Sequence, residues 1–159
     1  MCVAKRSFNG IELMKCAEII EPEPLLTDHK NVVKMPDGLL GFERIKQFEL
    51  LCSPEEAPFC WLQALDDPTV SFLVLSPFLA LPAYQPDLSA TDVDRLGLEN
   101  SEDALIFNIV TMHRNGPPTI NLKGPIIINR HTLLARQVIP TNAADYAVQH
   151  PVPLGPPAG

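Results

Sequence analysis

The sequence predicts an all-β fold: a small antiparallel β-barrel or pseudo-barrel, or a two-layer sandwich, with one short helix. Seventeen of the 159 residues are proline, and each proline removes a backbone donor and restricts the residue before it. Long helices are therefore disfavoured. Short apolar runs recur along the chain with turn residues between them, which is typical of small barrels and sandwiches.

The size and hydrophobicity of the chain indicate one domain. Its 46% hydrophobic residues are enough to build a single core at this length. We expect this domain to cover residues 1–150 and a flexible tail to cover 151–159, because the sequence from His150 onward is rich in proline and offers little to pack. No apolar run is long enough to span a membrane, and the residues after Met1 lack the apolar core of a signal peptide. We therefore expect a cytoplasmic protein without membrane contact.

Acidic residues are concentrated in the middle of the chain. Residues 49–103 contain eleven acidic residues and one basic residue, Arg95, so this segment carries a net charge of −10 and the rest of the chain carries +3. Direct binding of nucleic acid is disfavoured there, because phosphates would be repelled. The segment either attracts a basic protein partner or simply keeps surface loops hydrated.

Alternating and aromatic runs predict the strands of the first half of the chain. One or two short strands are expected within 10–20, and further strands at 31–35, 44–51, 59–64 and 70–75. The last two should form a hairpin, because only a short turn with Asp66, Asp67 and Pro68 separates them. We expect that acidic turn to be exposed.

One helix and four strands are predicted in the second half. Ser89 is a suitable N-cap, Asp92 falls in the first helical turn and Gly97 is a suitable stop, which predicts a short helix at 90–96. The apolar run at 104–112 is the strongest strand signal in the chain and should lie at the centre of the sheet. Further strands are expected at 119–122, 126–129 and 133–139.

The usual sequence motifs for catalysis, cofactors and metals are absent. The chain has no G-x-G-x-x-G, Walker lysine loop, H-E-x-x-H or G-x-S-x-G. Its cysteines, Cys2, Cys16, Cys52 and Cys60, include no Cys-x-x-Cys pair, and its histidines are dispersed. We therefore expect no enzyme, no cofactor and no metal site, and we expect Cys52 and Cys60 to be buried small apolar residues.

Two other hypotheses stay open from the residues alone. Trp61 is better explained as a core residue than as a ligand platform, and Gln63 should share its face of the strand. A small β-barrel could nevertheless bind a flavin-like ligand in a cleft near Trp61, Gln63 and Tyr84. A hydrolase could use Cys60 with a distant histidine.

The stretch "MPDGLLGFE", residues 35–43, is expected to form a tight corner. Pro36 presets its own φ, and Gly38 can take the positive φ that closes a turn. Gly41 then lets the backbone bend again. These glycines fit no phosphate-binding motif.

The corner is the first of several segments whose order is similar to that of the FliW family of flagellar assembly factors. It matches the family's Gly-Leu/Ile-Pro-Gly-Phe-Glu at Gly38, Leu39, Gly41, Phe42 and Glu43. The segment "PFCWLQALDDPTVSFLVLSPF" matches next, at Pro58, Phe59, Trp61, Leu62, Gln63, Asp66, Pro68, Phe72 and Pro77. The later matches are "LIFNIVT", then "INLKGPIIIN" with Asn121, Pro125 and Asn129, then "ARQVI", and finally Tyr146, His150 and Pro151.

This resemblance covers residues 30–151 and implies a mainly structural role for most of the matching positions. Those structural positions are Gly38, Gly41, Phe42, Trp61, Pro68, Phe72, Asn121, Pro125 and Asn129. The chain also departs from the family pattern. Leu40 stands where proline is usual, Gly124 where alanine is usual, Ala135 where glycine is common and Gln149 where arginine is frequent.

The function that the resemblance implies is that of a non-enzymatic, cytoplasmic regulator. FliW proteins bind flagellin before its export, and they bind the small basic translational repressor CsrA and so lift its block on flagellin synthesis. In such a protein Leu39 and Phe42 would pin the corner to the sheet, and Leu40 would be exposed for a partner. The candidate partner-binding residues are Leu40, Gln63, Asp66, Asp67, Asp92 and Asp94.

Overall fold

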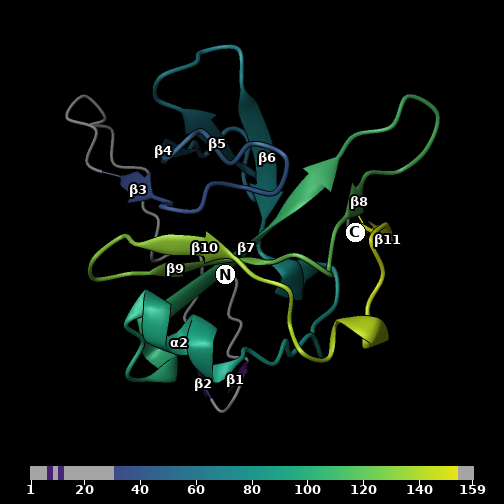
Figure 1. The fold of residues 1–159 in the computed structure, drawn as a ribbon. Coiled ribbons are helices and arrows are strands. Elements are labelled where there is room, and N and C mark those ends of the chain that lie inside the picture. Colours follow the sequence, from purple (N-terminus) through teal and green to yellow (C-terminus); the bar gives the residue numbers. More distant parts are fainter. Residues whose placement is uncertain (1–6, 9–10, 13–30, 154–159) are drawn as a thin grey trace.

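The computed structural model describes residues 7–8, 11–12 and 31–153, and their main element is one curled antiparallel sheet (Figure 1). Its strands follow the order β10-β9-β7-β6-β5-β4-β3, with β8 paired to β7 and β11 paired to β8. Their bounds are β3 (Val32–Lys34), β4 (Gln47–Cys52), β5 (Cys60–Ala64), β6 (Ser71–Leu75), β7 (Ala104–Thr111), β8 (Thr119–Ile120), β9 (Ile126–Asn129), β10 (Ala135–Gln137) and β11 (His150–Pro151). A separate pair joins β1 (Ser7–Phe8) to β2 (Ile11–Glu12).

The predicted all-β class is confirmed, and the barrel is a pseudo-barrel, because the sheet does not close. Its edge strands β3 and β10 approach each other only at a single bridge between Lys34 and Leu134. There the backbone N–H of Lys34 donates to the carbonyl of Leu133 at 2.9 Å. The rest of this seam has no strand pairing within the described residues.

Most predicted strands are present with shifted ends. The hairpin of β5 and β6 and the central position of β7 are both confirmed, since β7 pairs with β6, β8 and β9. β10 is shorter than the predicted 133–139, because Leu133 has a positive φ of 63° and belongs to the preceding turn. The strands expected within 10–20 are represented by Ile11–Glu12, and the remainder of that range lies outside the described residues.

The predicted helix is found as α2 (Ala90–Leu96). The Ser89 hydroxyl accepts a hydrogen bond from the Asp92 N–H at 3.1 Å, and Gly97 ends the helix with a φ of 67°. Asn129 of β9 donates its side-chain N–H to the Leu96 carbonyl at 2.9 Å. Both helix ends are therefore satisfied, one locally and one from the sheet.

Two hydrophobic cores lie on opposite faces of the sheet, because alternate residues of β7 point to opposite sides. Leu105 and Phe107 join the core inside the curl, and Ala104 and Ile106 join the core on the other face. The fully buried Tyr84 anchors the second core, and its hydroxyl donates to the Leu122 carbonyl at 2.7 Å. The described residues include three 3₁₀ helices, Pro77–Leu79, Ser101–Asp103 and Ala143–Asp145.

The two middle cysteines differ from the sequence prediction. β4 and β5 place Cys52 directly opposite Cys60, with 4.4 Å between their Cα atoms, and the two sulfurs form a disulfide. The prediction of two separate thiols is wrong, because strand register brings together residues whose spacing in the sequence is uninformative. Cys60 is nevertheless buried, as expected. A nucleophilic Cys60 is inconsistent with this bond, since the thiolate is the reactive form of cysteine.

Packing continues further toward the C-terminus than the sequence suggests. His150 and Pro151 form β11, and Val152 is buried and donates its N–H to the Pro118 carbonyl at 3.0 Å. The expectation that packing ends at His150 is therefore wrong for these residues, because β8 offers them a free edge. Residues 154–159 of the predicted tail lie outside the described part. Within that part, no helix has the length and apolarity needed to cross a bilayer.

Candidate protein-binding surface

The corner at residues 35–43 is built around two glycines. Gly38 has a φ of 67°, and a Cβ atom there would lie 2.6 Å from the Cα of Glu43, so only glycine fits. Gly41 has a φ of 90°, and its N–H donates to the Glu43 carboxylate at 3.0 Å. That hydrogen bond is the main reason why the pKa of Glu43 is lowered. The predicted corner is confirmed.

Leu40 is presented to solvent from this corner, with 60% of its surface exposed. Its N–H donates to the side-chain carbonyl oxygen of Gln137 on β10 at 2.9 Å, which ties the corner to the far edge of the sheet. Leu39 is buried beneath it, as expected. Phe42 is less buried than expected and rests edge-on against Phe72, with ring centroids 5.1 Å apart.

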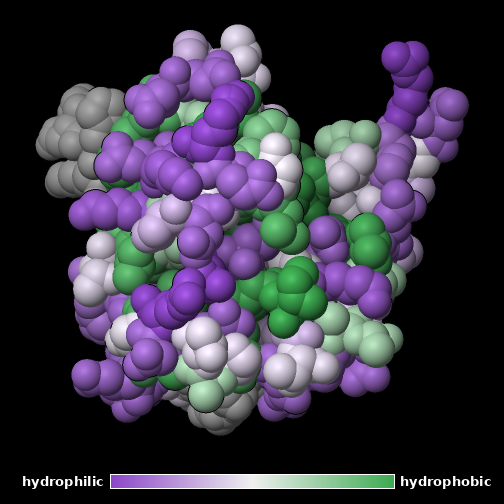
Figure 2. Space-filling model, in the orientation of Figure 1, coloured by the Kyte–Doolittle hydropathy of each residue, from purple (hydrophilic) through white to green (hydrophobic). Residues whose placement is uncertain are grey.

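Leu40 and Phe42 of the corner are exposed apolar side chains, and so is Ile139, which follows the Leu40 partner Gln137 by two residues. Figure 2 shows hydrophobic atoms reaching the surface on the face that carries the corner and the segment after β10. Single exposed apolar residues need no explanation, but several on one face are typical of a binding surface. We call Leu40, Phe42 and Ile139 the corner surface.

The acidic residues beside the corner are compensated by internal ion pairs. Arg136 on β10 pairs with Asp37 of the corner and, at 2.9 Å, with Asp92 of α2. Arg95 lies 3.8 Å from Asp37. Asp92 is buried and also accepts from the Ser89 hydroxyl at 3.0 Å, so the expectation that this acid is exposed is wrong. The network instead joins corner, helix and sheet.

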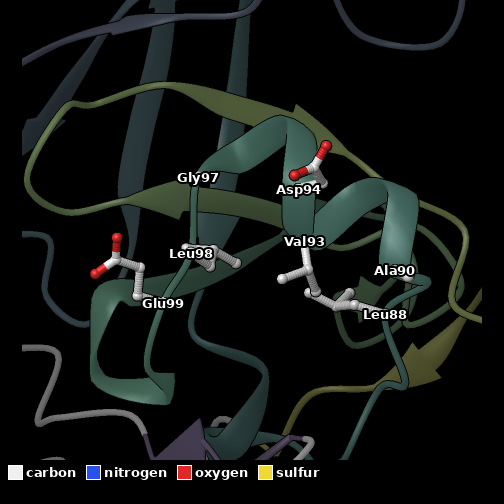
Figure 3. Close-up of a pocket in the computed structure, with 7 residues that line it drawn as sticks. All are labelled: Leu88, Ala90, Val93, Asp94, Gly97, Leu98 and Glu99. Atoms are coloured by element: carbon white, nitrogen blue, oxygen red, sulfur yellow. The ribbon is translucent and has the colours of Figure 1, made fainter.

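A hollow of about 570 Å³ lies beside α2 (Figure 3). In this view Val93 and Leu88 point toward each other, while the carboxylates of Asp94 and Glu99 stand at separate edges. Asp94 is exposed, as we expected for a candidate partner-binding residue. The lining residues are Leu88, Ala90, Val93, Asp94, Gly97, Leu98 and Glu99.

The turn between β5 and β6 uses two of the candidate residues to hold its own backbone. The Gln63 side chain donates to the carbonyls of Ala64 at 3.2 Å and Val70 at 3.1 Å. The Asp67 carboxylate accepts from the hydroxyl and the N–H of Thr69, at 2.6 and 3.1 Å, and these bonds lower the pKa of Asp67. Asp66 is exposed, as predicted for this turn. Gln63 and Asp67 are therefore engaged within the fold.

Trp61 lies on the outer face of the sheet, so its predicted place in the core is wrong. It is 36% exposed, and its indole N–H donates to the Glu56 carboxylate at 3.1 Å. The reason is strand alternation, which points its neighbours Cys60 and Leu62 inward and therefore Trp61 outward. Because Tyr84 is fully buried, it does not line a surface cleft with Trp61 and Gln63 in the described structure.

The remaining motif residues lie at turns and strand ends. Asn121 accepts from the Lys123 N–H at 2.9 Å, and the Pro125 carbonyl accepts from the Val138 N–H at 2.9 Å. The Asn129 side chain donates its N–H to the Leu96 carbonyl at the end of α2, and its side-chain oxygen accepts from the His131 N–H. Pro68 is exposed in the turn between β5 and β6.

Sequence reasoning missed residues that become neighbours only through tertiary structure. Gln137 and Arg136 of β10 meet the corner at sequence separations of 97 and 99, and no local pattern signals this. A second cavity of about 390 Å³ lies at the seam of the sheet, where Arg130 has two buried nitrogens without a partner in the described chain. Leu51 could have been found, because alternation points it outward beside the buried Leu50.

In the described residues, these features define a small curled-sheet protein that exposes apolar and acidic side chains on its surface. The family model for "FliW protein" matches residues 21–152. The flagellar assembly factor FliW of Geotalea uraniireducens is 39% identical over 122 residues, covering 76% of this chain and 74% of that one. That of Thermotoga neapolitana is 39% identical over 127 residues, covering 79% and 84%.

A solved structure is also similar. The crystal structure of the flagellar assembly factor FliW superposes with a TM-score of 0.73 at 33% sequence identity, covering 86% of this chain and 92% of that one. This chain belongs to the FliW family. The resemblance inferred from its sequence segments is therefore confirmed.

Proposed function

We propose that this protein is a non-enzymatic flagellar assembly factor that binds flagellin in the cytoplasm and antagonises the translational repressor CsrA by direct binding. Membership of the FliW family supports the proposal, since the relatives are named flagellar assembly factors. Because it binds both partners, the protein couples the synthesis of flagellin to its export.

The observation that carries the proposal is the rigid exposure of Leu40. Its backbone is fixed by Gln137 and by the two glycine turns, and Leu39 anchors it from below. A side chain held in this way loses little conformational entropy on binding. Because Arg136 and Arg95 compensate the nearby Asp37, apolar contact rather than net charge should drive binding at the corner surface. We assign this surface to flagellin.

The titratable groups support a function without catalysis. Among the described residues, four groups have clearly shifted pKa values, and each shift has a local structural cause. The pKa values of Glu43, Asp67 and Asp103 are lowered mainly by hydrogen bonds that hold turns, and that of Tyr84 is raised by burial. These groups do not converge on one cavity, as perturbed groups of an active site usually do.

The proposal is tested by measuring the affinity of the purified full-length protein for flagellin and for CsrA. We expect wild-type protein to bind both, and Leu40→Asp to weaken flagellin binding by about tenfold or more, since a carboxylate would then have to be desolvated in an apolar contact. Met112→Asp is the matched control, because Met112 is equally exposed at 60% but lies in the β7–β8 connection. Equal binding by wild type and Leu40→Asp would remove the corner surface from the proposal.

A further inference from the structure

We propose that the outer face of the β4–β5 hairpin is a second docking surface, and that it takes a basic protein segment that presents an aliphatic side chain beside lysine or arginine. Its members are Leu51, Trp61, Glu55 and Glu56, which we call the hairpin surface. The inference rests on the proposed function in one respect: its occupant there is CsrA, the basic partner.

The apolar part of the hairpin surface is a row of side chains across three strands. Strand register places Trp61 opposite Leu51 on one side and opposite Leu73 on the other. Leu73 packs against the second core, whereas Trp61 and Leu51 are 36% and 40% exposed. The row therefore runs from a covered core to an uncovered edge, and the described chain leaves Leu51 and Trp61 uncovered. Large apolar side chains in such a position are typical of interaction sites.

The hairpin surface is fixed before any partner arrives. The indole N–H of Trp61 is held by Glu56 at 3.1 Å, which sets the orientation of the ring. The disulfide between Cys52 and Cys60 joins the next rung of the same hairpin and closes the loop that carries Glu55 and Glu56. A rigid aromatic side chain loses little entropy on binding, and tryptophan is enriched at binding hot spots for this reason among others.

The charge around this row has one sign. Between Gln47 and Leu75 the chain contains five acidic residues and no lysine or arginine. Two cations of the described chain, Lys34 opposite Gln47 and Arg44 near Asp67, lie at the other end of the hairpin. Gln47 is four residues along β4 from Leu51, about 13 Å at the rise of a strand. Unlike Asp37 at the corner surface, Glu55 and Glu56 have no ion pair with a cation of the described residues.

This combination selects the chemistry of the partner. A lysine or arginine can pair with Glu55 or Glu56 and also lie over the face of Trp61, an arrangement in which ring and cation attract each other. An aliphatic neighbour of that cation can cover Leu51 and so remove its surface from water. An acidic partner would be repelled, so the surface discriminates by charge.

The test compares CsrA binding by Trp61→Ala and by the double variant Glu55→Gln, Glu56→Gln in the full-length protein. Glutamine at position 56 can still accept the indole hydrogen bond, so the double variant changes the charge and keeps the ring in place. We expect each variant to weaken CsrA binding by about tenfold or more and to leave flagellin binding unchanged. Met112→Ala, exposed far along the chain from this hairpin, should bind as wild type does.

Salt provides an independent readout. Raising NaCl from about 50 to about 300 mM should weaken CsrA binding by the wild type, and the double variant should lose most of this dependence. If Trp61→Ala fails to fold, Leu51→Lys replaces it, because a cation on the exposed face should repel the basic partner without opening the core. Normal CsrA affinity in both Trp61→Ala and the double variant would overturn the hairpin surface and leave the proposed function standing. Failure of the wild type to bind CsrA would instead overturn the proposed function as well.

Discussion

Gln137 contacts Leu40 and Gly124, two positions where the resemblance to the FliW family leads us to expect proline and alanine. Its carbonyl oxygen accepts from the N–H of Leu40, a donor that the usual proline would lack. Its NH₂ group donates to the Gly124 carbonyl at 3.1 Å, and a Cβ at Gly124 would lie 3.0 Å from that nitrogen. An alanine there would therefore displace the amide. Leu40 and Gly124 together make room for one side chain that ties the corner to β10.

Replacing this side chain should loosen the corner. We expect Gln137→Ala to lower the free energy of unfolding by about 1 to 2 kcal/mol, because two hydrogen bonds are lost. Urea unfolding followed by far-UV circular dichroism measures the change. Gln149→Ala is the control, since Gln149 is exposed and should give no measurable effect. Equal stability of the two variants would mean that Gln137 does not hold the corner.

Replacing Gly38, Gly41 and Gly116 by alanine should reduce stability to three different degrees, because the three positions differ in φ and in the space for a Cβ atom. Gly38→Ala combines a φ of 67° with a Cβ position 2.6 Å from backbone, whereas Gly41→Ala has a φ of 90° and open space. We expect losses of stability of at least about 2 kcal/mol for Gly38→Ala and about 1 kcal/mol for Gly41→Ala. Gly116→Ala, which has neither constraint, should be near neutral. Thermal melts of the three variants check the ranking, and a neutral Gly38→Ala would contradict it.

At the level of single elements, local signals were sufficient for α2 and for most strands. The ends of the helix were predictable from Ser89, Asp92 and Gly97, because helix capping depends on residues that are close in the sequence. Alternation and apolar runs locate β5, β6 and β7 for the same reason. The sequence could not predict which residue of one strand lies opposite which residue of the neighbouring strand. The disulfide and the edge pairing of β11 depend on register, which becomes visible only once the strands are assembled.

The disulfide gives the β4–β5 hairpin a measurable share of its stability. It closes a loop with a sequence separation of 8, for which the chain-entropy relation gives about 2.5 kcal/mol. We expect a reductant to lower the free energy of unfolding by about this amount. The double variant Cys52→Ala, Cys60→Ala should be destabilised already and should not respond to reductant. A wild-type protein that is equally stable with and without reductant would show that the bond is not formed in solution.

The short segment before β7 should make stability depend on pH. The Asp103 carboxylate accepts from the N–H groups of Asn100 and Glu99, at 2.8 and 2.9 Å, and these bonds with the nearby His131 lower its pKa. A lowered carboxylate pKa adds stability above the ordinary value, about 3.9 for aspartate, and this stability is lost as the pH falls through the folded value. Unfolding measured between about pH 5 and pH 2.5 should therefore show a smaller acid-induced loss in Asp103→Asn than in wild type. Equal losses would contradict this role of Asp103.

At the scale of the whole molecule, the two proposed surfaces lie on different faces of one sheet. Phe42 of the corner rests on Phe72, which pairs with the inward Leu62, whereas Trp61 points outward from the same strand. The net charge of residues 49–103 predicted an acidic surface, but it did not show which carboxylates are free to contact a partner. Ion pairs compensate Asp37 and Asp92, and the turn engages Asp67. Glu55 and Glu56 beside Trp61 have no such ion pair within the described residues, so their charge is available to a partner.

The central claim is that the protein binds its two partners through two separate surfaces. Isothermal titration calorimetry tests this claim by measuring the affinities of flagellin and CsrA for the wild type, Leu40→Asp and Trp61→Ala. We expect the wild type to bind both partners, Leu40→Asp to lose flagellin alone and Trp61→Ala to lose CsrA alone. Unchanged affinities for both partners in both variants, or a wild type that binds neither partner, would contradict it.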